Sequence, residues 1–77
     1  MEIQDFLEHF ADQFVDTDFS EFQPETKFRE LEEWSSIIAL SLITMIDEEY
    51  DVALKGEDIR RSETIQDIFD LVKHLKK

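Results

Sequence analysis

The sequence predicts an all-α fold, a four-helix bundle with a short third helix and a long first loop. One Gly and one Pro among 77 residues leave few positions for the tight turns that join β-strands. Apolar residues recur at helical spacing near both ends of the chain. Hydrophobic residues make up 42% of the sequence and include seven Phe, which excludes a disordered acidic tail. The length fits one small domain, residues 1–77.

The first helix is predicted over about residues 2–16. Apolar side chains recur there at the i, i+3, i+4, i+7 and i+11 positions, which is one face of an amphipathic helix. The acidic residues of this stretch lie largely off that face, and the segment "DTD" at 16–18 closes the helix. The predicted buried face consists of Ile3, Phe6, Leu7, Phe10 and Phe14.

The long first loop covers about residues 18–35 and contains Pro24. A connection of this length is uncommon inside a compact domain, and it is usually functional or anchored to the core. Four apolar side chains are available as anchors: Phe19, Phe22, Phe28 and Leu31.

The second helix is predicted over about residues 36–50, with Asp51 ending it. Serine is a favourable N-cap residue, so Ser35 or Ser36 is expected to cap this helix. Ten consecutive residues, 37–46, carry no charge. They span almost three turns, so some of them must point away from the core.

The orientation of this uncharged run is only partly predictable. Spacing indicates that Leu40 and Ile43, together with Ile37 and Ile46, face inward. The run is then either a helix buried deep among the others or the source of an exposed apolar strip for protein docking. The residues less easily placed are Ile38, Ser41, Leu42 and Met45.

Two further helices complete the bundle. The segment "GEDIRR" is long enough for a short third helix over 56–61. The fourth is predicted over 64–75, with Thr64 as N-cap and Asp67 as its capping-box partner. Lysines follow at its C-terminal end, where the helix dipole favours cations. Its predicted buried face is Ile65, Ile68, Phe69, Val72 and Leu75.

Charge and composition exclude several classes of function. Twenty acidic against eight basic residues give a net charge of −12, which disfavours nucleic-acid binding and favours basic protein partners. The chain has no cysteine, so it forms neither disulfides nor thiolate metal sites. Its first residues lack the pattern of a signal peptide, and the apolar run is too short to cross a bilayer. We therefore expect a cytoplasmic monomer without membrane insertion.

No catalytic or metal-binding pattern stands out, so the chain is not expected to be an enzyme. His9 and His74 have no neighbours at metal-ligand spacing and are predicted to be solvated. Gly56 is the only glycine, which excludes a Gly-rich phosphate loop. Arg60 and Arg61 can pair with a phosphate or with acids of a partner, or can serve surface solubility alone.

Several segments match a known pattern in order and spacing. They are "TKFREL" (26–31), Ser36-Ile37, "IDEEYDV" (46–52), "GEDI" (56–59) and "TIQDIFDLV" (64–72). On these residues the chain from position 24 onward resembles the acyl carrier protein family, with Ser36-Ile37 in place of that family's Ser-Leu step. Aligning Ser36 with the modified serine needs no gap as far as Leu75, whereas aligning Ser35 puts the segment out of step by one residue.

The resemblance implies a carrier domain. A phosphopantetheinyl transferase would move 4'-phosphopantetheine from coenzyme A onto Ser36, and acyl groups would be carried as thioesters on its thiol. Acyl-processing enzymes, namely synthases, ligases and transferases of fatty acid or polyketide biosynthesis, would be the partners. Ser36 is then an attachment site and not a catalytic residue. The attached group is expected between the second and third helices, near Met45, Leu54 and Ile59.

The chain departs from the family pattern at the attachment motif, which is "WSSI" and lacks the usual Asp before the serine. The bulky Trp34 serves as a partner contact, as a lid over the pantetheine, or as an apolar staple at the start of the helix. The acids that usually follow the serine are also missing. The alternative function is therefore a carrier-like module that is never modified and binds partners through its apolar second helix.

Overall fold

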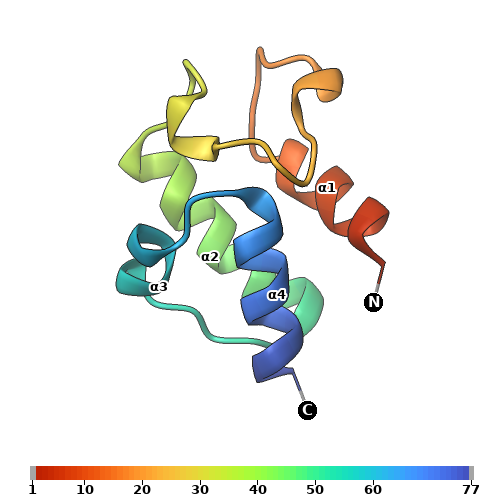
Figure 1. Cartoon of the computed structure of the whole chain (residues 1–77). Coiled ribbons are helices and arrows are strands. Elements are labelled where there is room, and N and C mark those ends of the chain that lie inside the picture. Colours follow the sequence, from red (N-terminus) through yellow and green to blue (C-terminus); the bar gives the residue numbers. More distant parts are fainter. Residues whose placement is uncertain (1, 77) are drawn as a thin grey trace.

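The computed structural model describes residues 2–76, and Figure 1 shows the arrangement of its helices. Two single-turn 3-10 helices precede the second α-helix, and no β-strand occurs between residues 2 and 76, which confirms the all-α prediction. The α-helices are α1 (Ile3–Ala11), α2 (Ser36–Tyr50), α3 (Gly56–Arg61) and α4 (Ile65–Leu75), and the 3-10 helices are Phe19–Glu21 and Phe28–Glu30.

Helix α1 is shorter than predicted, because it ends at Ala11 and does not reach residue 16. The chain leaves the helix through a tight turn in which the Phe14 N–H donates to the Ala11 carbonyl at 2.9 Å. Phe14 nevertheless stays buried, so the apolar pattern marked a core position correctly but not a helical one. The predicted face of α1 is otherwise buried, with Ile3 half-buried at its start.

The long loop is anchored by side chains and by backbone bonds. Phe22 and Phe28 are fully buried, whereas Phe19 is 46% exposed and does not act as the expected anchor. The loop also pairs with the start of α4. The Gln66 N–H donates to the Pro24 carbonyl at 2.8 Å, and the Ile65 N–H donates to the Thr26 carbonyl at 3.1 Å.

Helices α2 and α3 have the predicted bounds, and α4 begins one residue later than predicted, at Ile65, with Thr64 as its N-cap. Helix α2 ends at Asp51, whose backbone lies in the left-handed region with φ 57°. Helix α4 begins with the predicted capping box: the Thr64 hydroxyl accepts from the Asp67 N–H, and the Asp67 carboxylate accepts from the Thr64 N–H. Its apolar face is buried except at the last position, Leu75.

The orientation predicted for α2 is partly wrong. Leu40 is 65% exposed and Ile37 is 74% exposed, although spacing placed both inward. Ile46 is fully buried as predicted, and Ile43 is half-buried. The buried face instead includes two residues that spacing left open, Leu42 and Met45.

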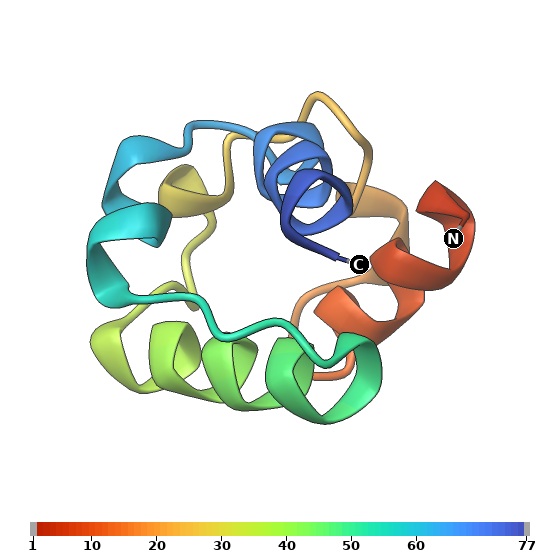
Figure 2. The same ribbon diagram turned by 90° about the horizontal axis from the view of Figure 1, so that it is seen from below.

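The helices surround one core. Helix α1 packs on α4, and α2 packs on α3. The connector after α2 runs back along that helix to α3 (Figure 2), and its alternate residues Val52 and Leu54 are buried. Phe6 joins three helices, because its ring contacts those of Tyr50 on α2 and Phe69 on α4 at centroid distances of 5.6 and 5.4 Å.

Candidate functional site

The two serines at the start of α2 have different roles. The Ser35 hydroxyl accepts from the Ile38 N–H at 3.3 Å, so Ser35 is the N-cap. Ser36 is the first residue of the helix, and its side chain is exposed. The capping role that either serine could have filled therefore falls to Ser35, and the Ser36 hydroxyl faces solvent.

The segment before the serines is fixed by Glu33. Its carboxylate accepts from the Val15 and Asp16 N–H groups, both at 2.8 Å, and from the Thr17 hydroxyl at 2.6 Å. The Thr17 hydroxyl and then the Val15 N–H stabilise the ionised form, so the pKa of Glu33 lies below its usual value. This carboxylate ties the chain that follows α1 to the approach to α2.

Trp34 packs against the core of the long loop. Its ring lies 4.8 Å from the Phe28 ring, with the two planes tilted by 58°. Trp34 is half-buried, and part of its surface lines a groove beside Ser36. The side chain therefore packs at the start of α2, as the staple role predicts, and also forms a wall of the groove.

An apolar groove of about 430 Å³ lies between α2 and α3, and we call it the α2–α3 groove. Ser36 lies on its wall, and most of the remaining lining is apolar. Arg29 and Arg60 supply the charged groups, and no carboxylate or imidazole lines the groove. The lining residues are Arg29, Trp34, Ser36, Ala39, Leu40, Ile43, Gly56, Ile59 and Arg60.

The groove lies between the predicted helices but is lined differently from the expectation. Ile59 is on its wall, as predicted. Leu54 instead points into the core, where it is buried, and Met45 lies on the other side of α2. Ala39 and Gly56, the small residues of the lining, were not predicted to belong to this groove.

Arg29 fixes the end of α3 that borders the groove. Its Nη1 donates to the carbonyls of Ile59, Arg60 and Ser62 at 3.1, 3.3 and 2.6 Å. These carbonyls belong to the last turn of a short helix, where intrahelical partners are missing. A residue in the long loop thus holds α3 in place, which the sequence did not indicate.

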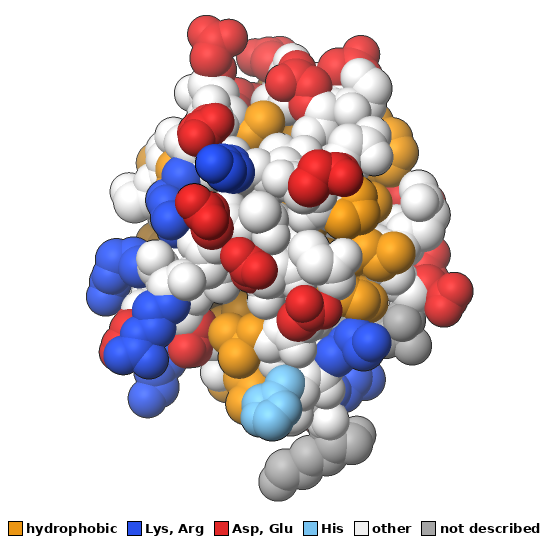
Figure 3. All heavy atoms as spheres, in the orientation of Figure 1, with side chains coloured by type: hydrophobic (Ala, Val, Ile, Leu, Met, Phe, Trp, Pro, Cys, Tyr) orange, Lys and Arg blue, Asp and Glu red, His pale blue; other side chains and the backbone are white. Residues whose placement is uncertain are grey.

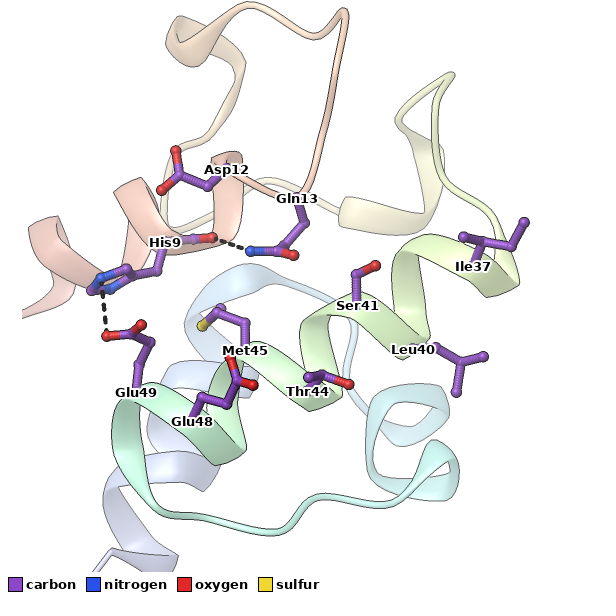
Figure 4. A pocket seen from close by; sticks show the side chains of 10 residues that line it. All are labelled: His9, Asp12, Gln13, Ile37, Leu40, Ser41, Thr44, Met45, Glu48 and Glu49. Atoms are coloured by element: carbon purple, nitrogen blue, oxygen red, sulfur yellow. Dashed lines mark hydrogen bonds and ion pairs between the residues drawn. The ribbon is translucent and has the colours of Figure 1, made fainter.

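A second concave surface, the α1–α2 pocket, lies on the opposite side of α2 (Figure 4). Its volume is about 430 Å³, and its lining combines acidic and polar side chains with Ile37, Leu40 and Met45. Ile37 and Leu40 point outward at one end of it (Figure 4). The lining residues are His9, Asp12, Gln13, Ile37, Leu40, Ser41, Thr44, Met45, Glu48 and Glu49.

His9 is not simply solvated, which corrects the prediction. Its Nδ1 lies 2.8 Å from the Tyr50 hydroxyl, and its Nε2 lies 3.6 Å from a Glu49 carboxylate oxygen. Burial, and then the charges of Asp5 and Glu49, raise the pKa of Tyr50 above its usual value. These contacts join α1 to the end of α2. His74 is exposed, as predicted.

The geometry limits the chemistry that this surface can perform. Ser36 has no histidine or carboxylate beside it in the α2–α3 groove, so the groove supplies no base to activate the hydroxyl. Residues 2–76 contain no cluster of side chains able to hold a metal ion. None of the helices in that range has the length and apolar character needed to cross a bilayer. An exposed hydroxyl beside an apolar groove is suited to attachment and binding.

A scan against protein-family models finds no match, and searches of the curated proteins and of the solved structures find none either.

Proposed function

We propose that this protein is an acyl carrier domain that bears 4'-phosphopantetheine on Ser36 and presents acyl intermediates to biosynthetic enzymes of the cytoplasm. One observation carries the proposal. Ser35 caps α2, which leaves the Ser36 hydroxyl exposed at the edge of an apolar groove between α2 and α3. The resemblance of residues 24–75 to the acyl carrier protein family supports the same serine.

The residues around Ser36 fit such a group. The hydroxyl is accessible to a transferase, the groove offers apolar walls to an aliphatic arm, and two arginines border it. The Ser36 oxygen would bond to phosphorus of coenzyme A, adenosine 3',5'-bisphosphate would leave, and the hydroxyl proton would pass to a base of the transferase. The attached arm would supply the thiol for thioester chemistry, which a chain without cysteine lacks.

The acidic surface supports docking to basic partners. The net charge of −12 attracts basic patches on a transferase or on acyl-processing enzymes and speeds their encounter. Acidic side chains crowd the upper part of the face in Figure 3, over the long loop. The first turn of α2 carries no acid, however, so contacts next to Ser36 would be apolar.

A second candidate function is an unmodified interaction module that docks partners through α2. The exposure of Ile37 and Leu40 favours it, since the two form an apolar strip on the first turns of the helix. In this case Ser36 would be an ordinary polar residue at a helix start, and its hydroxyl would carry nothing.

Intact mass separates the two functions. The protein is incubated with coenzyme A and a broad-specificity phosphopantetheinyl transferase, and its mass is measured. We expect the wild type to gain one phosphopantetheinyl group and Ser36→Ala to gain none. Ser35→Ala is the matched control, and it should still be modified although loss of the cap costs about 1 kcal/mol of helix stability.

Two results would contradict the carrier proposal as stated. An unchanged wild-type mass with several different transferases, in a protein shown to be folded by circular dichroism, would favour the unmodified module. Loss of labelling in Ser35→Ala but not in Ser36→Ala would move the attachment point to the other serine.

A further inference from the structure

The two sides of α2 differ in charge. The α1–α2 pocket is lined by Asp12, Glu48 and Glu49, whereas the α2–α3 groove has Arg29 and Arg60 as its only charged residues. In Figure 3 basic side chains gather along the left edge of the molecule, where α3 lies in Figure 1. A protein with a net charge of −12 thus places two cations at the groove that contains Ser36.

Neither cation has a carboxylate partner within the part of the chain that the structure describes. The close ion pairs of residues 2–76 are His9 with Glu49 and Arg61 with Glu57. Arg29 and Arg60 take part in neither, even though the chain has more than twice as many acids as bases. A guanidinium without a carboxylate partner is open to an anion from outside the protein.

Arg60 is the better placed of the two to bind that anion. The guanidinium of Arg29 is engaged with the end of α3 through its Nη1 and lies 5.2 Å from the centroid of the Phe28 ring. Arg60 has an exposed side chain, and its Nη1 lies 3.4 Å from the position that a Cβ would take on Gly56. This contact lays the Arg60 side chain along α3 beside the groove.

We infer that Arg60 binds the phosphate of the group attached to Ser36 and so directs the arm into the α2–α3 groove. The inference rests on the proposed carrier function. A guanidinium binds phosphate through parallel N–H donors, and Ser36 and Arg60 line the same groove. The α1–α2 pocket offers the phosphate carboxylates in place of arginines, so the arm is expected on the α2–α3 side of the helix.

The test compares two free ligands, 4'-phosphopantetheine and pantetheine, which differ only in the phosphate. Each is titrated to millimolar concentration into unmodified protein, and the Trp34 indole and the Gly56 and Ile59 amides are followed by NMR. We expect the phosphorylated ligand to bind about tenfold more tightly than pantetheine, with shifts at these groove residues. Arg60→Ala should remove that preference.

Arg61→Ala is the matched control. Arg61 is the adjacent residue on the same helix, pairs with Glu57 at 3.8 Å and does not line the groove. This variant removes the same charge from the protein. It should keep the tenfold preference if Arg60 contacts the phosphate. It should lose the preference only if the overall charge of the protein is responsible.

Three results would overturn the inference: equal affinity for the two ligands, no binding of either, or an equal loss of preference in both variants. The mass measurement on Ser36 is independent. If the protein is modified but shows no Arg60-dependent preference for 4'-phosphopantetheine over pantetheine, the carrier function stands and the Arg60 contact does not. A preference in a protein that no transferase modifies would retain the phosphate site and contradict the carrier.

Discussion

Glu33 illustrates how a single side chain positions a site from a distance. Its carboxylate accepts three hydrogen bonds from residues 15–17. It thereby fixes the segment in front of Trp34 and the serines. Charge-assisted hydrogen bonds are stronger than neutral ones, so the ionised form of Glu33 is the one that stabilises the fold.

Glu33→Gln should lower the stability of the protein at pH 7, because an amide replaces a charged acceptor. The pKa of Glu33 is lower in the folded chain, so its contribution is present above the pKa of the unfolded chain, about 4.3, and is lost as the pH falls through the folded value. The stability difference between wild type and variant should therefore shrink below about pH 4. Urea unfolding of both proteins at several pH values measures this difference in the free energy of unfolding.

Glu32→Gln is the control for this experiment. Glu32 is adjacent and exposed, and its substitution removes the same charge. It should leave both the stability and its pH dependence close to those of the wild type. Equal behaviour of the two glutamine variants would show that net charge, and not the bonds to residues 15–17, is responsible.

At the scale of the element, α2 is bounded by two local devices. Ser35 caps its start, and Asp51 ends it in the left-handed conformation, where its N–H donates to the Asp47 carbonyl at 3.0 Å. Glycine is the usual residue at such a C-terminal position, and an acid there also opposes the helix dipole. The conformation and charge of Asp51 at the end of α2 therefore lower the stability of the protein.

Asp51→Gly should stabilise the protein by about 0.5–1 kcal/mol, because glycine adopts a positive φ without steric penalty. The measurement is the urea midpoint of the helical circular dichroism signal. Asp51→Ala removes the charge but keeps a Cβ, so it should gain less. An equal gain in both variants would assign the effect to charge and not to the backbone.

At the scale of the whole molecule, aromatic rings from α1 and the long loop form much of one core. Phe10 is fully buried, and its ring lies near four other Phe rings at centroid distances between 5.8 and 6.1 Å. Two of these partners, Phe22 and Phe28, belong to the loop. Phe10 therefore couples the loop that precedes Ser36 to the helical bundle.

Phe10→Ala should cost about 3–5 kcal/mol, which is comparable to the total stability of a domain this small. We expect it to be largely unfolded at 25 °C or to have a sharply lower urea midpoint. Phe19→Ala is the control, since that ring is 46% exposed, and it should change stability by less than about 1 kcal/mol. Similar losses in both variants would contradict the assignment of Phe10 to the centre of the core.

The sequence predicted some elements closely and others poorly, for identifiable reasons. The starts of α2 and α4 were predictable to within one residue because serine and threonine mark helix starts through bonds to N–H groups one turn in. The end of α1 was not, since the chain that follows it, at residues 15–17, is held by Glu33, which lies 16 to 18 positions away. The prediction that Phe19 anchors the loop was wrong, because composition alone does not show which aromatic side chain reaches the core.

The candidate site was predictable only in part. Ser36 and the space between α2 and α3 followed from a sequence pattern. The run 37–46 contains no charged residue to mark the solvent side, so Leu40 was placed inward although it is exposed. Arg29, Glu33 and Met45 acquire their places from contacts between distant segments, which spacing along one helix cannot reveal.

The sequence by itself determined the helical class, most helix ends and the serine pair, because these depend on interactions within a turn or two of the chain. Tertiary structure alone decided which residues line the groove beside Ser36, which face of α2 is covered, and on which side of that helix the arginines and acids lie. Those outcomes depend on how helices and loop pack around a shared core, and packing joins residues that the sequence keeps far apart.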